Sequence, residues 1–285
     1  KHIDNFNNIY STFERNGIIC ERELGIDGQI SNIKEQYDIY KNKPYNDKEK
    51  LLGRKLIVSP GAIGYLYSMA NIFKEAIINN YEYIMICDDD IRIIDDFTDK
   101  FSKLYNSLWG KFRILMLGSS QWDWDNIKYS NNYYHPNDSS NGSFSNIYHR
   151  STFEQIYNKI LNFTHPFDDE PMKSNFINNY CYVSYPNLII AQLEQSSIRK
   201  KKNNRSYERF KWIKDNYNYY TIKEKSHIKY KHISKKNFDL HFVIGIVTYN
   251  RYIYLKKCMD SLINTFQDNI DYTIIVADGN SNDNS

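Results

Sequence analysis

The chain has 285 residues, of which 41% are hydrophobic and 25% are charged, with a net charge of +3. These values are ordinary for a folded globular protein of one large domain, or a domain and a half. No apolar run is long enough to cross a bilayer, and the N-terminus lacks the apolar core of a signal peptide, so we expect no membrane span and favour the cytoplasmic side. The cysteines form no CxxC pair, which argues against a zinc or redox site.

A helix and a strand are the first elements that the pattern predicts. Pro60 and Gly61 mark a helix start, and apolar residues then recur at steps of three and four over 62–78. After a turn signal, the apolar run 83–87 predicts a buried strand. That strand leads directly into three consecutive aspartates: Asp88, Asp89 and Asp90.

Strands and helices continue to alternate after the aspartates. The run 112–117 is apolar, as in a buried strand, and a loop rich in Asn, Ser and Tyr over 119–143 leads to a helix around 151–161. This alternation favours an α/β layered fold, in which ligands gather beyond the carboxyl ends of the strands. The three aspartates stand at such an end.

Three adjacent carboxylates repel one another, and burying them is costly unless they are paired or bound to a metal. On an extended chain, Asp88 and Asp90 point to the same side, so both face one site. Two carboxylates suit a hard cation such as Mn²⁺ or Mg²⁺, which commonly bridges protein carboxylates to substrate phosphates. The alternative is an exposed acidic turn that caps the next element.

Four ordered segments of the chain resemble one enzyme family. They are FERNGIICERELGIDGQI from Phe13, SPGAIGYLYSMANIFKEAIINNYEYIMICDDDIRI from Ser59, GSFSNIYHRS from Gly142 and YVSYPNLIIAQLEQSSIR from Tyr182. In this order they resemble glycosyltransferase family 25, which includes lipooligosaccharide and procollagen galactosyltransferases. The resemblance covers most of 13–199 and implies a GT-A fold, a Rossmann-like mixed sheet flanked by helices.

The resemblance implies an inverting hexosyltransferase. Such an enzyme moves a sugar from a nucleotide diphosphate sugar, here with UDP favoured, to a hydroxyl of a glycan or protein acceptor, with Mn²⁺ or Mg²⁺ as cofactor. The metal ligands would be Asp88 and Asp90, and the donor would contact Asp89, Gly64 and Ser68. The chain departs from the family at position 69, where Met replaces the usual His, and it begins after the family's first strand.

An acidic stretch bounded by prolines supplies candidates for the catalytic base. An inverting transfer needs a carboxylate that takes the proton from the acceptor hydroxyl. The stretch HPFDDEP offers Asp168, Asp169 and Glu170. A rigid, solvated surface turn is the alternative interpretation of these acids.

Two tryptophans follow the second predicted strand, in the stretch QWDWD. Trp122 and Trp124 could stack on a sugar ring, but tryptophans in a loop after a strand more often cover the edge of the core. We favour the second interpretation.

A second resemblance begins at Phe242. The residues from 242 to 285 predict strand, helix and strand, in which Leu255 and Met259 belong to the apolar face of the helix. This order resembles the opening of a family 2 glycosyltransferase. In that family, the residues matching Asn250, Arg251 and Asp278 lie at the nucleotide base.

The basic charge is concentrated in Arg199–Lys236, which has 14 Lys and Arg against 3 acids, with aromatic residues between them. Such a segment could bind single-stranded nucleic acid. No RNA- or DNA-binding motif accompanies it, so we favour a linker whose aromatics pack on a neighbouring domain and expect no nucleic acid partner. The expected domains are a family 25-like domain over 1–199, a basic linker over 200–240 and an incomplete family 2-like domain over 241–285.

The C-terminal segment is too small to bury a stable core alone. We expect it to pack against the first domain or a second copy of the chain, and we expect the gene to continue beyond Ser285. The alternative to an enzyme is a catalytically silent GT-A domain that binds a glycan or a partner, as Met69 and the missing first strand allow.

Overall fold

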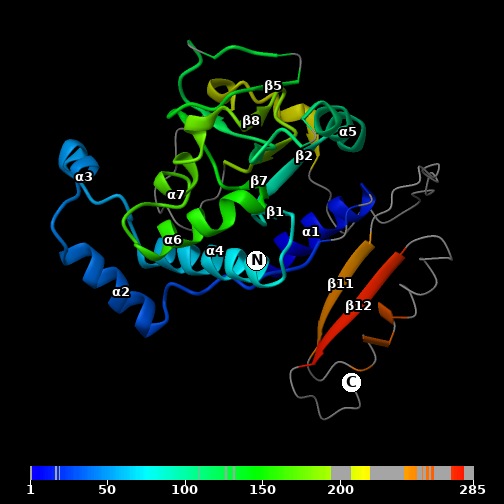
Figure 1. The fold of residues 1–285 in the computed structure, drawn as a ribbon, viewed down its shortest axis with the longest axis horizontal. Coiled ribbons are helices and arrows are strands. Elements are labelled where there is room, and N and C mark those ends of the chain that lie inside the picture. The colour runs from blue at the N-terminus through cyan, green and yellow to red at the C-terminus, as the bar shows by residue number, and fades with distance from the viewer. Residues whose placement is uncertain are drawn as a thin grey trace. The chain divides into compact units, whose positions relative to one another are not determined.

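The computed structural model describes residues 2–16, 18, 20–108, 110–125, 127–130, 132–193, 207–218, 241–248, 252, 255–256, 258–259 and 271–278. These residues fall into two compact units, one within 1–224 and one within 225–285, which are described separately (Figure 1). In the described part of the chain, no helix combines the length and apolar character needed to cross a bilayer.

Helices and strands alternate through the first unit, as the sequence predicts. Its helices are α1 (His2–Arg15), α2 (Ser31–Asn42), α3 (Asp47–Leu52), α4 (Pro60–Ile78), α5 (Phe97–Leu108), α6 (Phe153–Leu161) and α7 (Glu170–Lys173). Its strands are β1 (Tyr83–Cys87), β2 (Ile91–Ile94), β3 (Ile114–Met116), β4 (Ser120–Gln121), β5 (Tyr133–Tyr134), β6 (Ser140–Asn141), β7 (Ser145–His149), β8 (Cys181–Ser184), β9 (Ile189–Ala191) and β10 (Tyr217–Asn218). The helix predicted over 62–78 and the strand predicted over 83–87 are confirmed as α4 and β1.

A mixed five-stranded sheet organises the first unit, in the order β1-β7-β3-β8-β5. Strand β7 runs antiparallel to both β1 and β3, and β3 runs parallel to β8. Strands β1, β3 and β8 therefore point the same way, and their carboxyl ends share one edge of the sheet. A smaller sheet, β10-β2-β9, continues from the turn that follows β1.

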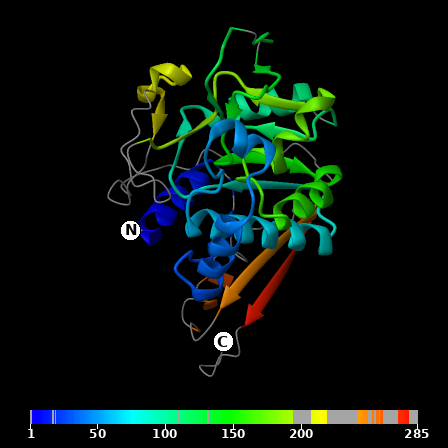
Figure 2. The ribbon, with the colours of Figure 1, turned by 90° about the vertical axis from the view of Figure 1, so that its left-hand side faces the viewer.

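The two faces of the five-stranded sheet are covered by separate apolar clusters. Along β3, Ile114 and Met116 belong to a cluster with residues of α4 and α6, while Leu115 belongs to a cluster with residues of α1 and α5. This alternation is the period of two expected of a strand buried on both faces. The sheet is thus flanked by helices, with α4 (cyan) running beside it in Figure 2.

A serine cap and a proline in the first turn favour the start of helix α4 at Pro60. Ser59 is extended, and its Oγ accepts a hydrogen bond from the backbone N–H of Ala62 at 3.3 Å. Pro60 occupies the first turn, where a missing N–H does no harm. The side chains of Leu66 and Phe73 are almost fully buried, at 1% and 0% exposed, and they fix the helix against the sheet.

Part of the basic segment belongs to the first unit. Residues 207–218 include β10, which pairs with β2, and they bury Phe210, Trp212 and Tyr217 in the α1 and α5 cluster. The Trp212 Nε1–H donates to Asn187 Oδ1 at 2.6 Å. The expectation that aromatics of this segment pack on a neighbouring domain is confirmed for these residues, and 194–206 and 219–240 lie outside the described residues.

The second unit contains two parallel strands. They are β11 (His241–Thr248) and β12 (Asp271–Asp278), which pair from His241 opposite Asp271 to Thr248 opposite Asp278. Residues 252, 255, 256, 258 and 259 between them are helical. A parallel pair needs a crossover, and a helix is the usual one. The predicted order of strand, helix and strand is confirmed for the described residues, and how this unit packs stays a prediction.

Candidate active site

The three aspartates lie at the shared carboxyl edge of the sheet. Strand β1 ends at Cys87, and the Asp88 N–H donates to the carbonyl of Phe144, in front of β7, at 2.9 Å. Two residues later, the Asp90 carbonyl accepts from the Gln192 N–H at 2.8 Å. We call Asp88, Asp89 and Asp90 the acidic turn. Hydrogen bonds fix both of its ends to neighbouring segments of the sheet, in agreement with its predicted place at the sheet edge.

The carboxyl group of Asp88 is strongly perturbed. Burial raises its pKa from 3.8 to about 7, and the nearby charges of Asp90, Asp89 and Asp168 raise it further. The Tyr65 hydroxyl donates to Asp88 Oδ1 at 3.2 Å, which opposes the shift. Negative charge is therefore in excess at this site, as in a site that holds a cation.

Tyr65 joins α4 to the acidic turn, and the sequence analysis missed it. Its hydroxyl also lies 3.0 Å from Ser143 Oγ, in the loop before β7. Burial, and then the charge of Asp88, raises the Tyr65 pKa well above its ordinary value, so the hydroxyl stays protonated. Its position four residues after Gly61, on a helix that leads to the acidic strand, is the signal that could have revealed it.

The predicted base candidates separate in the structure. The charge of Asp168 raises the pKa values of both Asp88 and Tyr65, so this carboxylate lies near the acidic turn. Asp169 instead forms an ion pair with Lys48. Glu170, in α7, pairs with Lys159 at 2.6 Å and with His165 Nδ1 at 2.9 Å. The structure thus brings Asp168 near the acidic turn. Burial lowers the pKa of Lys173, and the charges of Asp169 and Asp168 oppose this shift, so Asp168 also has a basic side chain nearby.

Ser68 and Gly64 hold a chain segment against α4. The Ser68 Oγ accepts a hydrogen bond from the Ile26 N–H at 2.8 Å and donates to the Gly64 carbonyl at 2.9 Å. A Cβ at Gly64 would lie 2.3 Å from the Ile26 carbonyl oxygen. These contacts give both residues a structural role, and their predicted contact with a donor stays a prediction.

We expect Gly64→Ala to destabilise the first unit by about 2 kcal/mol, because the new methyl group would push the Ile26 backbone away from α4. Gly25→Ala is the matched control, since a Cβ there meets nothing within 4 Å. Urea unfolding of both variants measures the difference. Equal stability of the two variants would show that the close approach is not needed.

Gln192, whose backbone N–H is bonded to Asp90 in the turn, has a side-chain amide nitrogen with no hydrogen-bond partner among the described residues. This Nε2 atom is buried. A buried amide without a partner costs about 1–3 kcal/mol, and it suits a site completed by a ligand oxygen. Gln192 belongs to the last of the four segments quoted above, but nothing in the sequence singles out its amide.

The described residues contain no group of three or more His, Cys, Asp and Glu side chains that could hold a metal ion by itself. The carboxylates of Asp88 and Asp90 are compatible with a cation that takes its other ligands from substrate phosphates and water. The raised pKa of Asp88 and the buried donor of Gln192 both fit such a shared site.

The pH dependence of stability follows from Asp88. The Asp88 pKa is higher in the folded protein than the ordinary 3.8, so the folded state binds the proton more tightly than the unfolded state does. The stability that comes from this proton is lost as the pH rises through about 7. Without metal, Asp88→Asn should therefore be more stable than the wild type near pH 8, by on the order of 2 kcal/mol, with a smaller difference near pH 5. Urea unfolding in EDTA tests this, with the exposed Asp38→Asn as control; a difference independent of pH would contradict it.

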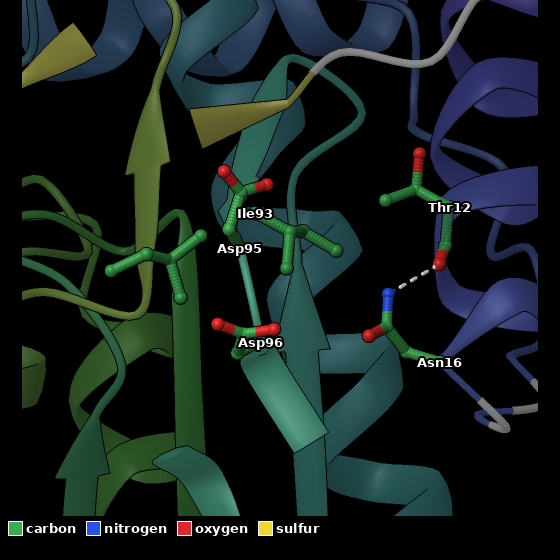
Figure 3. Close-up of a pocket in the computed structure, with 6 residues that line it drawn as sticks. Thr12, Asn16, Ile93, Asp95 and Asp96 are labelled. Atoms are coloured by element: carbon green, nitrogen blue, oxygen red, sulfur yellow. Dashed lines mark hydrogen bonds between the residues drawn. The ribbon is translucent and has the colours of Figure 1, made fainter. Parts of the chain in front are cut away.

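A polar hollow of 370 Å³ lies at the other end of β2, between α1 and the start of α5. Figure 3 shows Asp95 and Asp96 facing Thr12 and Asn16 across it. The Asn16 Nδ2–H donates to the Thr12 carbonyl at 2.9 Å, and the Asp96 carbonyl accepts from the Lys100 N–H in the first turn of α5. Because β2 separates it from the acidic turn, this hollow is not part of the candidate site.

In the second unit, Asp278 ends β12 directly opposite Thr248, which ends β11. Asn250 and Arg251 lie outside the described residues. Asp278 therefore stands at the carboxyl end of a parallel pair, where ligands of α/β sheets gather.

The second unit resembles one known protein family. Residues 243–285 match the model of glycosyl transferase family 2. The match covers most of β11 and all of β12, and it supports glycosyl transfer as the general activity, with a nucleotide sugar and an acceptor as partners. No curated protein matches the chain.

Proposed function

We propose that the first unit is an inverting, metal-dependent glycosyltransferase of GT-A fold, related to family 25. It transfers a hexose from a nucleotide diphosphate sugar, UDP-linked in the first instance, to a hydroxyl of a glycan or protein. The observation that carries the proposal is the gathering of Asp88, Asp90 and Asp168 at the carboxyl edge of the sheet, where burial and mutual repulsion raise the pKa of Asp88 to about 7. The glycosyl transferase family 2 match later in the chain supports the same chemistry.

The acidic turn is the proposed place for the metal and the donor diphosphate. Asp88 and Asp90 would hold Mn²⁺ or Mg²⁺, which neutralises the charge that develops on the leaving diphosphate. Tyr65 orients the Asp88 carboxylate through its 3.2 Å hydrogen bond. The buried Nε2 of Gln192, which has no hydrogen-bond partner among the described residues, and the backbone of Asp89 would bind donor oxygens.

Asp168 is the proposed general base. In an inverting transfer the acceptor hydroxyl attacks the anomeric carbon from the face opposite the leaving phosphate and gives its proton to a carboxylate. The charge of Asp168 raises the pKa of Asp88, so this carboxylate lies near the proposed metal ligands. A base near the metal ligands, and not one of them, fits this geometry.

The second unit is proposed to bind a nucleotide base through Asp278, with Asn250 and Arg251 beside it. This assignment rests on the family 2 match and on the place of Asp278 at the end of β12.

A second candidate function is a catalytically silent domain that binds a glycan or a partner. Met69, where family 25 usually has His, is buried in the apolar cluster around α4, so it supplies no titratable group. Donor binding without turnover would favour this candidate.

A screen of UDP-, GDP- and TDP-sugars with the full chain tests the proposal. We expect nucleotide diphosphate release with Mn²⁺ and none with EDTA, because the leaving diphosphate needs the cation. Release that is equal in EDTA, or absent with every donor and every cation, would contradict the proposed enzyme.

A further inference from the structure

Three aromatic side chains form a partly exposed surface at the end of β8. We call Trp124, Tyr129 and Tyr185 the aromatic shelf. The rings of Trp124 and Tyr129 are stacked, with centroids 6.0 Å apart and planes 20° apart, and the Tyr185 ring lies 4.6 Å from that of Tyr129. Tyr129 is 42% exposed, which is unusual for a ring that only covers a core.

One basic side chain from residues 207–218, that of Lys211, lies against the shelf. The Lys211 Nζ lies 4.3 Å from the centroid of the Trp124 ring and 3.0 Å from the Tyr129 hydroxyl oxygen. Lys211 adopts a left-handed backbone conformation, with φ at +56°, which costs a residue other than glycine about 1 kcal/mol. The Arg209 Cζ lies 4.4 Å from the centroid of the Trp122 ring, which is near the shelf residue Trp124 in sequence. Residues 207–218 carry three basic side chains, Arg209, Lys211 and Lys214, against two acids, Glu208 and Asp215.

A cavity opens beside the shelf. Its volume is 610 Å³, and it is bounded by Tyr185, Tyr207, Glu208 and residues 211–214. Ile213 in this wall is 65% exposed. A hollow of this size suits a small ligand, and its walls combine apolar surface with a few polar groups, as binding sites do.

The shelf and the acidic turn share one edge of the sheet. Tyr185 follows the carboxyl end of β8, as Asp88 follows that of β1, and both strands point the same way. The order β1-β7-β3-β8 separates the two ends by three strand spacings, about 14 Å in total. A ligand of several linked rings can therefore contact the shelf while one end reaches the turn.

We infer that the aromatic shelf and Lys211 bind the acceptor, and that this acceptor is a saccharide with an anionic group such as a carboxylate or a phosphate. The exposed ring of Tyr129, with Tyr185 beside it, suits the apolar face of a sugar ring, and the Lys211 ammonium suits the anion. The role as acceptor site rests on the proposed function; saccharide binding itself does not. Trp122 and Trp124 themselves pack against the two apolar clusters, so the favoured interpretation that they cover the edge of the core is confirmed.

The test measures binding of 3′-sialyllactose, an anionic probe, and of neutral lactose to the full chain by titration calorimetry. We expect sialyllactose to bind more tightly than lactose, with the difference shrinking at high salt. Lys211→Gln and Tyr129→Ala should each weaken sialyllactose binding about fivefold or more. The control is Tyr180→Ala, because Tyr180 is 50% exposed but precedes β8, at the opposite edge of the sheet.

Several outcomes would overturn the inference. They are the absence of binding to either sugar, equal affinity for the two sugars, or unchanged affinity in both shelf variants. Binding of an acidic peptide at the shelf in place of either sugar would also overturn it. Release of nucleotide diphosphate from a donor is measured separately. Donor turnover without saccharide binding would contradict the role of the shelf but support the proposed enzyme. Saccharide binding without donor turnover would support the shelf and contradict the proposed enzyme.

Discussion

Replacing Asp88 with Ala is expected to lower the rate of sugar transfer by about 1000-fold or more, because the metal would lose one of its two carboxylate ligands at the leaving diphosphate. The fold should persist, since the substitution removes one acid from a repelling group of carboxylates. Asp90→Ala should behave in the same way. Initial rates with saturating Mn²⁺ and donor, together with the melting temperature, measure both effects.

Asp95→Ala is the matched control for that experiment, because Asp95 is also an acid at the end of a strand but lies at the other end of β2 from the acidic turn. Its transfer rate should stay within about twofold of the wild type, as for a residue that contacts no substrate. Retention of full activity by both Asp88→Ala and Asp90→Ala would refute the metal assignment.

Replacing Asp168 with Asn should lower kcat by about 100- to 10,000-fold with little change in donor affinity, because it removes the proton acceptor and keeps the shape of the side chain. Asp169→Asn is the control: this acid pairs with Lys48, at the surface, and its loss should leave kcat nearly unchanged. A large loss in Asp169→Asn, with normal kcat in Asp168→Asn, would move the base to the neighbouring residue. The pH profile adds a second readout, since loss of the base should remove the acidic limb of the kcat profile.

The position of the acidic turn could be predicted because both signals are local. An apolar run of strand length that ends in charged residues identifies the carboxyl end of a buried strand. The helix of α4 is equally local, since Pro60 and the apolar steps of three and four define it without reference to the rest of the fold.

The choice among Asp168, Asp169 and Glu170 could not be made from sequence. It depends on which of these acids the fold brings near Asp88 and Tyr65, on segments far away in the chain. Only such long-range contacts distinguish the roles of adjacent residues with the same chemistry. The pairing of β10 with β2 was equally hidden, because a strand of two residues has no periodicity to detect.

For Gly64, the sequence suggested a role in ligand binding where the structure shows a packing contact. Its place in a family motif suggested a contact with the donor, while its contact in the structure is with the backbone of Ile26. A glycine needed for close packing of two backbone segments has the same sequence signature as one needed for ligand approach. Tyr65 and Ser143 were missed for a related reason: each is an ordinary polar residue until α4 and the loop before β7 are brought together at Asp88.

The most direct test of the acidic turn as a metal-dependent donor site is titration calorimetry of UDP, with GDP in parallel, into the full chain with Mn²⁺ or with EDTA. The wild type should bind one of these nucleotides with Mn²⁺ and lose that binding in EDTA. Asp88→Asn should show the weak binding of the EDTA sample even when Mn²⁺ is present. Equal affinity of the wild type and Asp88→Asn, or an affinity that Mn²⁺ does not change, would contradict the site.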